Sequence, residues 1–374
     1  MRIGIVCYPT FGGSGVVATE LGKALAEKGH EVHFITYRQP VRLDFFSENI
    51  SYHEVTVPDY PLFEYAPYET ALTSTLVDVV KYKNLDLLHV HYAIPHASVA
   101  YLAKQILAAE GIHIPAITTL HGTDITLVGK DESYEPVVTF AINQSDGITA
   151  VSKSLRDDTY AFFNIKKDIE VIPNFIDLKR FSKKAKEHFK TAIAPAGEKL
   201  LIHTSNFRKV KRVEDVVRMF EKVQKVIPSK LLLIGDGPER NHIEKLCREI
   251  GICDHIRFLG KQEVVEEILS VSDLFLMPSE TESFGLAALE AMACQVPVIS
   301  SNAGGIPELN IQGVTGFLSA VGNIDEMAKN AIHILSDDNR LLQFKHNALE
   351  RAKEFDINKI MPLYEDFYVK VLGK

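Results

Sequence analysis

The chain has 374 residues, of which 46% are hydrophobic, and its formal net charge is −8. This length and apolar content are enough for two domains of ordinary size, each with its own core. The negative charge argues against an extended basic surface for nucleic acid or anionic membranes. No stretch approaches the ~18 uninterrupted apolar residues of a membrane-spanning helix. We therefore expect a soluble protein with no nucleic-acid or membrane partner.

The four cysteines, at positions 7, 247, 253 and 294, contain no C-x-x-C pair. Two of them lie inside apolar runs, which is typical of buried free thiols. Free thiols are in turn typical of a reducing compartment. The first residues also lack a long apolar segment followed by a cleavage site. These features predict a cytoplasmic location.

The first elements of the chain predict a βαβ unit. Residues 2–8 have the apolar pattern of a buried strand, and residues 31–36 have the pattern of a second one. Between them, the glycine-rich stretch 10–15 precedes a helical pattern that stops at Gly29. A strand, a glycine-rich turn and a helix in this order are typical of nucleotide-binding Rossmann-like domains.

The same turn leaves a second interpretation open. The segment Gly13-Ser-Gly-Val-Val-Ala18 satisfies the G-x-G-x-x-[GA] pattern of dinucleotide-binding proteins. The second strand ends without the Asp or Glu that would hold the ribose of NAD. Arg38 follows that strand and would suit the 2′-phosphate of NADP. An NADP-dependent oxidoreductase that uses this loop therefore remains an alternative.

Two later strands deliver polar side chains to one sheet edge. The strand pattern of residues 85–90 leads to His91 and Tyr92, and the pattern of residues 117–120 leads to His121. In open α/β sheets, ligands bind at the carboxyl ends of the parallel strands. The three side chains are therefore candidates for a site, with a structural histidine that closes a strand as the alternative for His121.

Three histidines close together raise the question of a metal site. His89 and His91 alternate along one strand and share a face, and His96 follows shortly after. No acidic or cysteine ligand accompanies them locally. We expect packing or ligand contacts from these rings, and no metal.

The strand and helix pattern restarts in the middle of the chain. Residues 199–204 predict a strand that leads into a basic loop with Arg208 and Lys211, and residues 231–234 predict the next strand. A second series of this kind predicts two Rossmann-like domains. Cations at a strand end are well placed to neutralise a pyrophosphate, although a solvated surface would carry the same residues.

The most informative stretch lies between the apolar runs 274–277 and 296–300. Residues 286–293 are rich in good helix formers, so Glu282 precedes a helix start and Glu290 lies inside the helix. The N–H groups at a helix start have no partner within the helix and attract an anion. An anion there, with hydroxyl groups near both carboxylates, would suit a nucleotide diphosphate sugar. A capped amphipathic helix with solvated acids fits the spacing equally well.

The segment Glu282-Ser-Phe-Gly-Leu-Ala-Ala-Leu-Glu290 resembles the E-x7-E signature of the family-4 retaining glycosyltransferases. Gly304-Gly-Ile-Pro-Glu308 follows it, as in the family. The resemblance implies an α/β protein of GT-B fold, with two Rossmann-like domains facing across a cleft and a C-terminal helix that returns to the first domain. The expected domains are 1–170 with 356–374 on the acceptor side, and 171–355 for the nucleotide sugar.

The resemblance also implies roles at matching positions. Glu282 would engage the donor sugar, Glu290 the ribose, and His121 the sugar near the scissile bond. Arg208 and Lys211 would hold the diphosphate, although their spacing is shorter than is usual in the family. The other donor-binding positions are in the glycine loop, the strand that reads the base and the helix start: Gly13, Gly15, Phe258, Leu259, Ser283, Phe284, Gly285 and Leu286.

Acceptor-binding residues are predicted only from sheet-edge positions, and these are Ser14, Tyr92, Thr123 and Asn143. The resemblance implies that Asp124, next to Thr123, also borders the acceptor pocket. The cations and the helix start would hold the leaving-group charge. We therefore expect neither a metal ion nor a cofactor.

Four further segments narrow the resemblance. Residues 8–17, 89–96, 120–125 and 205–212 resemble family members that transfer N-acetylglucosamine from UDP-N-acetylglucosamine to L-malate, the first step of bacillithiol biosynthesis. The implied activity is that of a retaining, metal-independent hexosyltransferase. Gln295 departs from the family, which usually has Gly after the signature helix. A UDP-sugar epimerase of the same architecture remains an alternative, and a homo-oligomer is left open.

Overall fold

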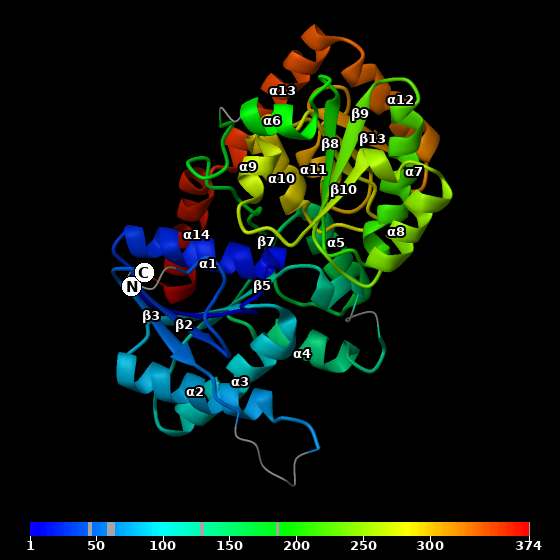
Figure 1. Cartoon of the computed structure of the whole chain (residues 1–374). Helices are drawn as coiled ribbons and strands as arrows, with labels where there is room; N and C mark the ends of the chain where they lie inside the picture. Colours follow the sequence, from blue (N-terminus) through cyan, green and yellow to red (C-terminus); the bar gives the residue numbers. More distant parts are fainter. Residues whose placement is uncertain (44–46, 58–63, 128–130, 185–186, 374) are drawn as a thin grey trace. The chain divides into compact units, whose positions relative to one another are not determined.

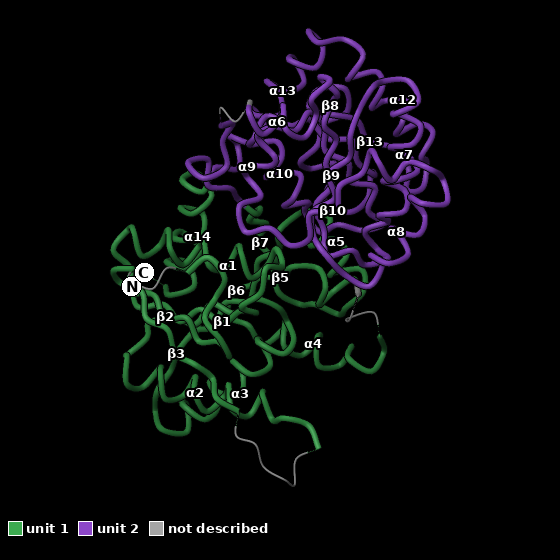
Figure 2. The backbone as a smooth tube through the Cα atoms, in the orientation of Figure 1, with its two compact units in different colours: residues 1–174, 357–374 green, residues 175–356 purple. Residues whose placement is uncertain are grey.

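The computed structural model describes residues 1–43, 47–57, 64–127, 131–184 and 187–373. They form two compact units (Figure 2). Unit 1 comprises Met1–Asn174 and Ile357–Lys374, and unit 2 comprises Phe175–Asp356. The chain thus passes between the units after residues 174 and 356, where the sequence analysis placed the boundaries after 170 and 355.

Unit 1 is built on a seven-stranded parallel sheet with the order β3-β2-β1-β4-β5-β6-β7 (Figure 1). The central strands β4 and β5 are buried along their whole length, because helices cover both faces of a parallel sheet. The strands are β1 Arg2–Val6, β2 Glu31–Thr36, β3 Ile50–Glu54, β4 Leu87–His91, β5 Ala116–Leu120, β6 Gly147–Ala150 and β7 Glu170–Val171.

The helices of unit 1 form two layers on this sheet. α1 and α14 lie on one face, and α2 and α3 lie on the other (Figure 1). The helices are α1 Gly13–Glu27, α2 Tyr68–Lys83, α3 Ser98–Ala109, α4 Glu135–Gln144, α5 Lys153–Phe162 and α14 Ile357–Leu372, with the short turn segments η1 Ala93–Ala97 and η2 Thr123–Leu127.

Helix α14 returns the end of the chain to unit 1, as the sequence analysis predicts. The ring of Tyr368 is fully buried, and its hydroxyl lies 2.7 Å from His89 Nδ1 in β4. Glu365 Oε1 lies 2.7 Å from His30 Nε2, just before β2. A buried hydrogen bond and a partly buried polar pair therefore tie the last helix to the first half of the chain.

Unit 2 has a six-stranded parallel sheet with the order β10-β9-β8-β11-β12-β13. Its strands are β8 Lys199–Thr204, β9 Ser229–Ile234, β10 Ile256–Gly260, β11 Leu274–Met277, β12 Val298–Ser301 and β13 Gly316–Ser319. Its helical segments are α6 Glu187–Ile193, η3 Lys209–Lys211, α7 Val213–Gln224, α8 Arg240–Glu249, η4 Cys253–His255, α9 Val265–Leu269, α10 Leu286–Ala293, α11 Ile306–Leu309, α12 Ile324–Leu335, α13 Asp338–Ala352 and η5 Lys353–Phe355.

Each sheet reverses its strand order at one point. In unit 1 the point lies between β1 and β4, and in unit 2 it lies between β8 and β11. Ligands of open α/β sheets bind outside the carboxyl ends of the strands at such a switch point. The segments that follow these four strands are those in which the sequence analysis placed the glycine loop, Tyr92, the basic loop and Glu282. None of the helices in the described part of the chain is long and apolar enough to cross a membrane.

Candidate active site

In unit 2, the carboxyl ends of β8 and β11 bring Lys211 and Glu282 together. Lys211 Nζ lies 2.6 Å from Glu282 Oε1. The hydroxyl of Ser279 donates to the same carboxylate oxygen at 2.9 Å. Both charged side chains are partly buried, with exposed fractions of 23% and 15%. Two residues 71 positions apart thus form one polar group at the switch point.

The two loops that carry this pair are fixed through their backbones. The N–H of Glu280 donates to the carbonyl of Val210 at 2.8 Å, and the N–H of Gly305 donates to the carbonyl of Glu282 at 2.9 Å. A Cβ at Gly304 would lie 2.0 Å from that carbonyl oxygen, so only glycine permits this approach. The segment that begins with Gly304 therefore supports the position of Glu282.

Sequence reasoning missed His203 of β8, which braces the basic loop. His203 Nδ1 lies 2.8 Å from the carbonyl oxygen of Leu276, and Nε2 lies 2.8 Å from Ser205 Oγ. Because a carbonyl oxygen only accepts, Nδ1 carries the hydrogen and Nε2 accepts from the hydroxyl. Burial lowers the pKa of His203 to about 4, so the ring adds no charge beside Lys211 at neutral pH. Its signal was a histidine inside an otherwise apolar strand.

The cations of the basic loop differ in their contacts. Arg212 Nε donates to Asp215 at 2.5 Å, next to the start of α7, while Lys211 pairs with Glu282. Arg208 is exposed, and its side chain makes no hydrogen bond or ion pair with any residue the structure describes. Lys211 therefore contacts the signature acid, and Arg208 is placed only in the same loop.

Helix α10 begins at Leu286, four residues after Glu282, whereas the sequence analysis places Glu282 at or just before the helix start. Its N-cap is Gly285 with φ +94°, a backbone conformation that glycine adopts without strain. The first N–H groups of the helix have no partner within it. Phe284 packs its buried ring on Phe355, with ring centroids 5.5 Å apart, so only its backbone is available to a ligand. Glu290 is 9% exposed. The remaining predicted position, which is partly buried, is Ser283.

The same helix ends in a turn at Gln295, the position at which the family usually has glycine. The N–H of Val296 donates to Ala291 O at 2.9 Å, and the N–H of Gln295 donates to Met292 O at 3.0 Å. This is the Schellman pattern, which needs a left-handed residue at the position after the cap. Gln295 has φ +62°. The turn thus keeps the geometry for which glycine is preferred, although a side chain occupies the position.

The edge strand β10 carries the residues predicted to contact the base. Its pairing with β9 shifts register between Phe258 and Gly260, so Leu259 lies in a bulge. The carbonyl of Leu259 accepts a hydrogen bond from Gln262 Nε2. The guanidinium of Arg240 lies over the ring of Phe258, 5.6 Å from its centroid. Leu259 thus has no residue opposite it in β9, and Arg240 is a neighbour that the sequence did not indicate.

In unit 1, the glycine loop meets the end of β4. The hydroxyl of Tyr92 donates to Ser14 Oγ at 2.7 Å, so two of the predicted acceptor residues are in contact. Helix α1 begins at Gly13. A Cβ at Gly15 would lie 2.4 Å from the carbonyl oxygen of Tyr8, which makes the second glycine of the loop a packing requirement.

Beside this contact, four histidines form a buried cluster. His91 Nδ1 lies 2.8 Å from His121 Nε2, and His96 Nδ1 donates to the carbonyl oxygen of His91 at 2.6 Å. His89 Nε2 lies 2.7 Å from Thr119 Oγ1. Burial lowers the pKa of His89 and His121 to about 3 and that of His96 to about 4, and it lowers the pKa of His91 well below its ordinary value. All four rings are therefore neutral near pH 7.

One ring of the neutral cluster, that of His121, is only partly buried. His121 also lies beside Tyr92, with ring centroids 5.3 Å apart. Its Nε2 is engaged by His91, so its Nδ1 is the ring nitrogen that remains for a substrate. Within the described residues, no group of three or more His, Cys, Asp and Glu side chains has an arrangement that would hold a metal ion.

Asp124 serves the backbone of the neighbouring loops. Its carboxylate accepts from the N–H groups of Ala93 at 2.8 Å and Gly122 at 3.0 Å. Burial raises the pKa of Asp124 to about 6 in spite of these bonds. The residue thus clamps the ends of β4 and β5 together, whereas the adjacent Thr123 is exposed.

Asn143 lies elsewhere. It occupies the last turn of α4, which leads into the first residue of β6 and therefore lies at the amino-terminal edge of the sheet. Its amide group bonds to the carbonyls of Thr139 and Asn164 and to the N–H of Lys166. This position does not fit a role in acceptor binding, because the other candidates follow the carboxyl ends of the strands.

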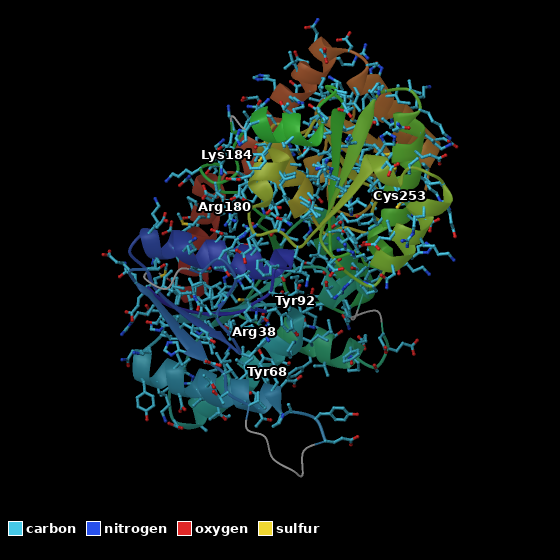
Figure 3. The ribbon with its side chains drawn as sticks, in the orientation of Figure 1. Arg38, Tyr68, Tyr92, Arg180, Lys184 and Cys253 are labelled. Carbon is cyan, nitrogen blue, oxygen red and sulfur yellow. The ribbon has the colours of Figure 1, made fainter. Side chains whose placement is uncertain are left out.

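Two aromatic residues and one cation lie at the carboxyl edge of unit 1 (Figure 3). Arg38 follows β2 and stacks on Tyr37, 5.5 Å from the ring centroid. Tyr37 contacts Tyr68 at the start of α2, with ring centroids 5.7 Å apart. The hydroxyl of Tyr68 is buried and has no hydrogen-bond partner among the described residues. Arg38 is exposed and makes no salt bridge within them.

Sequence comparison bears on both halves of the chain. Residues 11–180 match the family model "Glycosyltransferase Family 4", and residues 184–351 match the model "Glycosyl transferases group 1". The chain is 50% identical over 378 residues to N-acetyl-alpha-D-glucosaminyl L-malate synthase of Bacillus anthracis, a match that covers 100% of this chain and 97% of the relative. A glycosyltransferase of Methanocaldococcus jannaschii is 28% identical over 357 residues and covers 90% of each chain.

Solved structures share the fold. HepE of Anabaena in complex with UDP and glucose has a TM-score of 0.83 and 18% identity over 98% of this chain and 99% of that chain. Sucrose-phosphate synthase of Thermosynechococcus elongatus has a TM-score of 0.83 and 21% identity over 100% and 99% of the two chains. The oxidoreductase and epimerase interpretations gain no support from these relatives. The identity to a full-length relative and the two family models together show that the chain belongs to the family-4 glycosyltransferases, which have the GT-B fold.

Proposed function

We propose that this protein transfers N-acetylglucosamine from UDP-N-acetylglucosamine to the hydroxyl group of L-malate, with retention of configuration and release of UDP. The single observation that carries the proposal is the 50% identity, over the whole chain, to a relative named as an N-acetylglucosaminyl malate synthase. The product of such a transfer is the first intermediate of bacillithiol biosynthesis.

We assign the nucleotide sugar to unit 2, where the polar groups suit its charge. Without a ligand, the Lys211 ammonium group is neutralised by Glu282 at 2.6 Å. A donor that offers a sugar hydroxyl to the carboxylate and a phosphate oxygen to the ammonium would replace this pair with two charge-assisted hydrogen bonds. As the sugar–phosphate bond breaks, negative charge grows on the diphosphate. Lys211, Arg208 and the first N–H groups of α10 would stabilise that charge without a metal ion.

We assign the acceptor to unit 1, where the histidine rings near the switch point are neutral and one cation, Arg38, follows the neighbouring strand β2. Ser14, Tyr92 and Thr123 offer hydroxyl groups, and His121 offers the Nδ1 of an uncharged ring to a sugar or acceptor hydroxyl. A dicarboxylate also requires a positive charge or strong donors. Arg38 and Tyr68, whose hydroxyl group has no partner among the residues that the structure describes, are at the same sheet edge. We therefore add both to the acceptor-binding residues.

The function is tested by UDP release from UDP-N-acetylglucosamine, measured with and without L-malate in excess EDTA. We expect release that depends on L-malate and falls sharply when D-malate replaces it. UDP release that does not depend on malate would be consistent with a glycosyltransferase but would contradict malate as the acceptor. Loss of activity in EDTA that added magnesium restores would overturn the metal-independent mechanism.

A further inference from the structure

Two of the four cysteines lie side by side in unit 2. Cys247 is in the last turn of α8, and Cys253 begins η4. Their Sγ atoms are 2.6 Å apart, and both residues are free thiols. An S–S bond is ~2.05 Å long, so a shift of less than an ångström would join them. The other two cysteines, Cys7 and Cys294, are also free and are at most 1% exposed.

The backbone holds the two thiols in this arrangement. After α8, Gly251 adopts φ +73°, which turns the chain back, and the N–H of Ile252 donates to the carbonyl of Cys247 at 3.1 Å. The thiol of Cys247 donates to the carbonyl of Glu244 at 3.2 Å.

The two thiols differ in their access to solvent. Cys247 is 2% exposed and belongs to the hydrophobic core of unit 2, and burial raises its pKa to about 12. Cys253 is only partly buried, although it packs against the same core. A small oxidant in solution thus reaches Cys253 first, and Cys247 is the neighbouring thiol that can react with the oxidised Cys253.

We propose that Cys247 and Cys253 form a reversible intramolecular disulfide when the protein meets a hydroperoxide. The Cys253 thiolate attacks one peroxide oxygen, the O–O bond breaks, and Cys253 becomes a sulfenic acid while an alcohol or water leaves. The Cys247 sulfur then loses its proton and attacks the Cys253 sulfur. An S–S bond forms, the S–O bond breaks, and water leaves. Two thiols lose two electrons, which the peroxide gains. A small thiol in excess reverses the reaction by exchange.

The location of the pair predicts what the bond changes. Helix α8 follows the carboxyl end of β9, so its last turn lies toward the amino ends of the strands, and η4 leads directly into β10. The disulfide would tie α8 to the segment that enters β10, at the edge of the sheet opposite to Lys211 and Glu282. We therefore expect glycosyl transfer to be unchanged by the bond.

The chain offers a direct assay. Trypsin cleaves after Arg248, so the two cysteines fall in separate peptides, residues 246–248 and 249–257. The folded, full-length protein is treated with hydrogen peroxide, its remaining thiols are alkylated, and the digest is analysed by mass spectrometry without reduction. We expect the two peptides as one joined species that disappears after treatment with dithiothreitol.

Matched variants separate the outcomes. Cys253→Ser should abolish the joined species, whereas Cys7→Ala with Cys294→Ala should leave it unchanged. The proposal is overturned if the peptides stay separate and alkylated, or if Cys253 gains oxygen atoms without becoming linked to Cys247. It is also overturned if the link forms as fast in urea as in the folded protein, because the fold would then not be its cause.

Discussion

At the switch point of unit 2, a lysine and a glutamate form an ion pair that Ser279 completes. At the equivalent point of unit 1, the conspicuous side chains are histidines whose pKa values burial has lowered until the rings are neutral. The same strand order thus presents an ion pair in one unit and, apart from the backbone-bound carboxyl group of Asp124, neutral hydrogen-bonding groups in the other. This difference fits the two halves of a glycosyl transfer, since the leaving diphosphate is highly charged and the reacting hydroxyl groups are not.

The largest effect is expected from removal of the unit 2 cation. Lys211→Ala should lower kcat by about 10²–10³-fold, because an electrostatic group aimed at the developing charge is lost. Lys209→Ala is the matched control, since Lys209 is an exposed cation two residues away and should retain most of the activity. Steady-state kinetics with both substrates provides the measurement. Equal losses in the two variants would mean that general basicity of the loop matters and the contact with Glu282 does not.

A smaller effect is expected from the unit 1 cation. Arg38→Ala should raise the KM for malate by about 10–100-fold, the value of a charge-assisted hydrogen bond of ~1.5–3 kcal/mol. The KM for the nucleotide sugar should change little. Arg38→Lys keeps the charge and should recover part of the loss. A malate KM that stays at the wild-type value in Arg38→Ala would remove this residue from the acceptor site.

Acid should destabilise unit 1 more than unit 2. The pKa values of His89, His96 and His121 are lowered to about 3, 4 and 3 from 6.5. At pH values between the lowered and the ordinary pKa, these histidines bind more protons in the unfolded chain than in the folded protein. The stability they contribute is complete above about pH 6.5 and is lost as the pH falls, by up to ~1.4 kcal/mol per pH unit for each histidine. Asp124, with its raised pKa of about 6, acts in the opposite direction and offsets only one of them.

Unit 2 has one comparable group, His203. Unit 1 should therefore lose protection from hydrogen exchange earlier than unit 2 when the pH is lowered from 7 to 5. The control is the strand β9, which contains no histidine and should exchange alike at both pH values after correction for intrinsic rates. Earlier opening of unit 2 would show that the buried histidines do not govern acid stability.

The smallest effect is expected at the end of α10. Gln295→Gly should raise the free energy of unfolding by about 1 kcal/mol, because a side chain in the left-handed region is strained and glycine is not. Gln295→Ala keeps the Cβ atom and should gain little. Urea denaturation of the three proteins measures both differences. A similar gain in both variants would assign the effect to the glutamine side chain and not to the backbone.

The sequence predicted those parts of the site that depend on local pattern. Glu282 and Lys211 follow strand ends, because strand and turn signals are local and ligands of open α/β sheets gather at strand ends. The start of α10 was predicted only to within four residues. The brace of His203 on Ser205 and the contact of Tyr92 with Ser14 depend on strand order and side-chain direction. Neither can be read from spacing along the chain.

The places of other candidates depend on the fold in the same way. Asn143 was chosen from its place near a strand, but the helix that carries it ends at the opposite edge of the sheet. The dinucleotide pattern at residues 13–18 arises because Gly15 is needed for close packing on Tyr8, a requirement that many strand–turn–helix units share. The backbone role of Asp124, whose carboxylate holds two N–H groups, is likewise not visible in the sequence, and its place beside the acceptor stays a prediction.

The division of charge between the units is tested most directly by the binding of UDP, measured by titration calorimetry on Lys211→Met and Arg38→Ala. We predict that the Kd for UDP rises about tenfold or more in Lys211→Met and stays at the wild-type value in Arg38→Ala. A loss of UDP affinity in Arg38→Ala, with none in Lys211→Met, would contradict the account and place the nucleotide in unit 1.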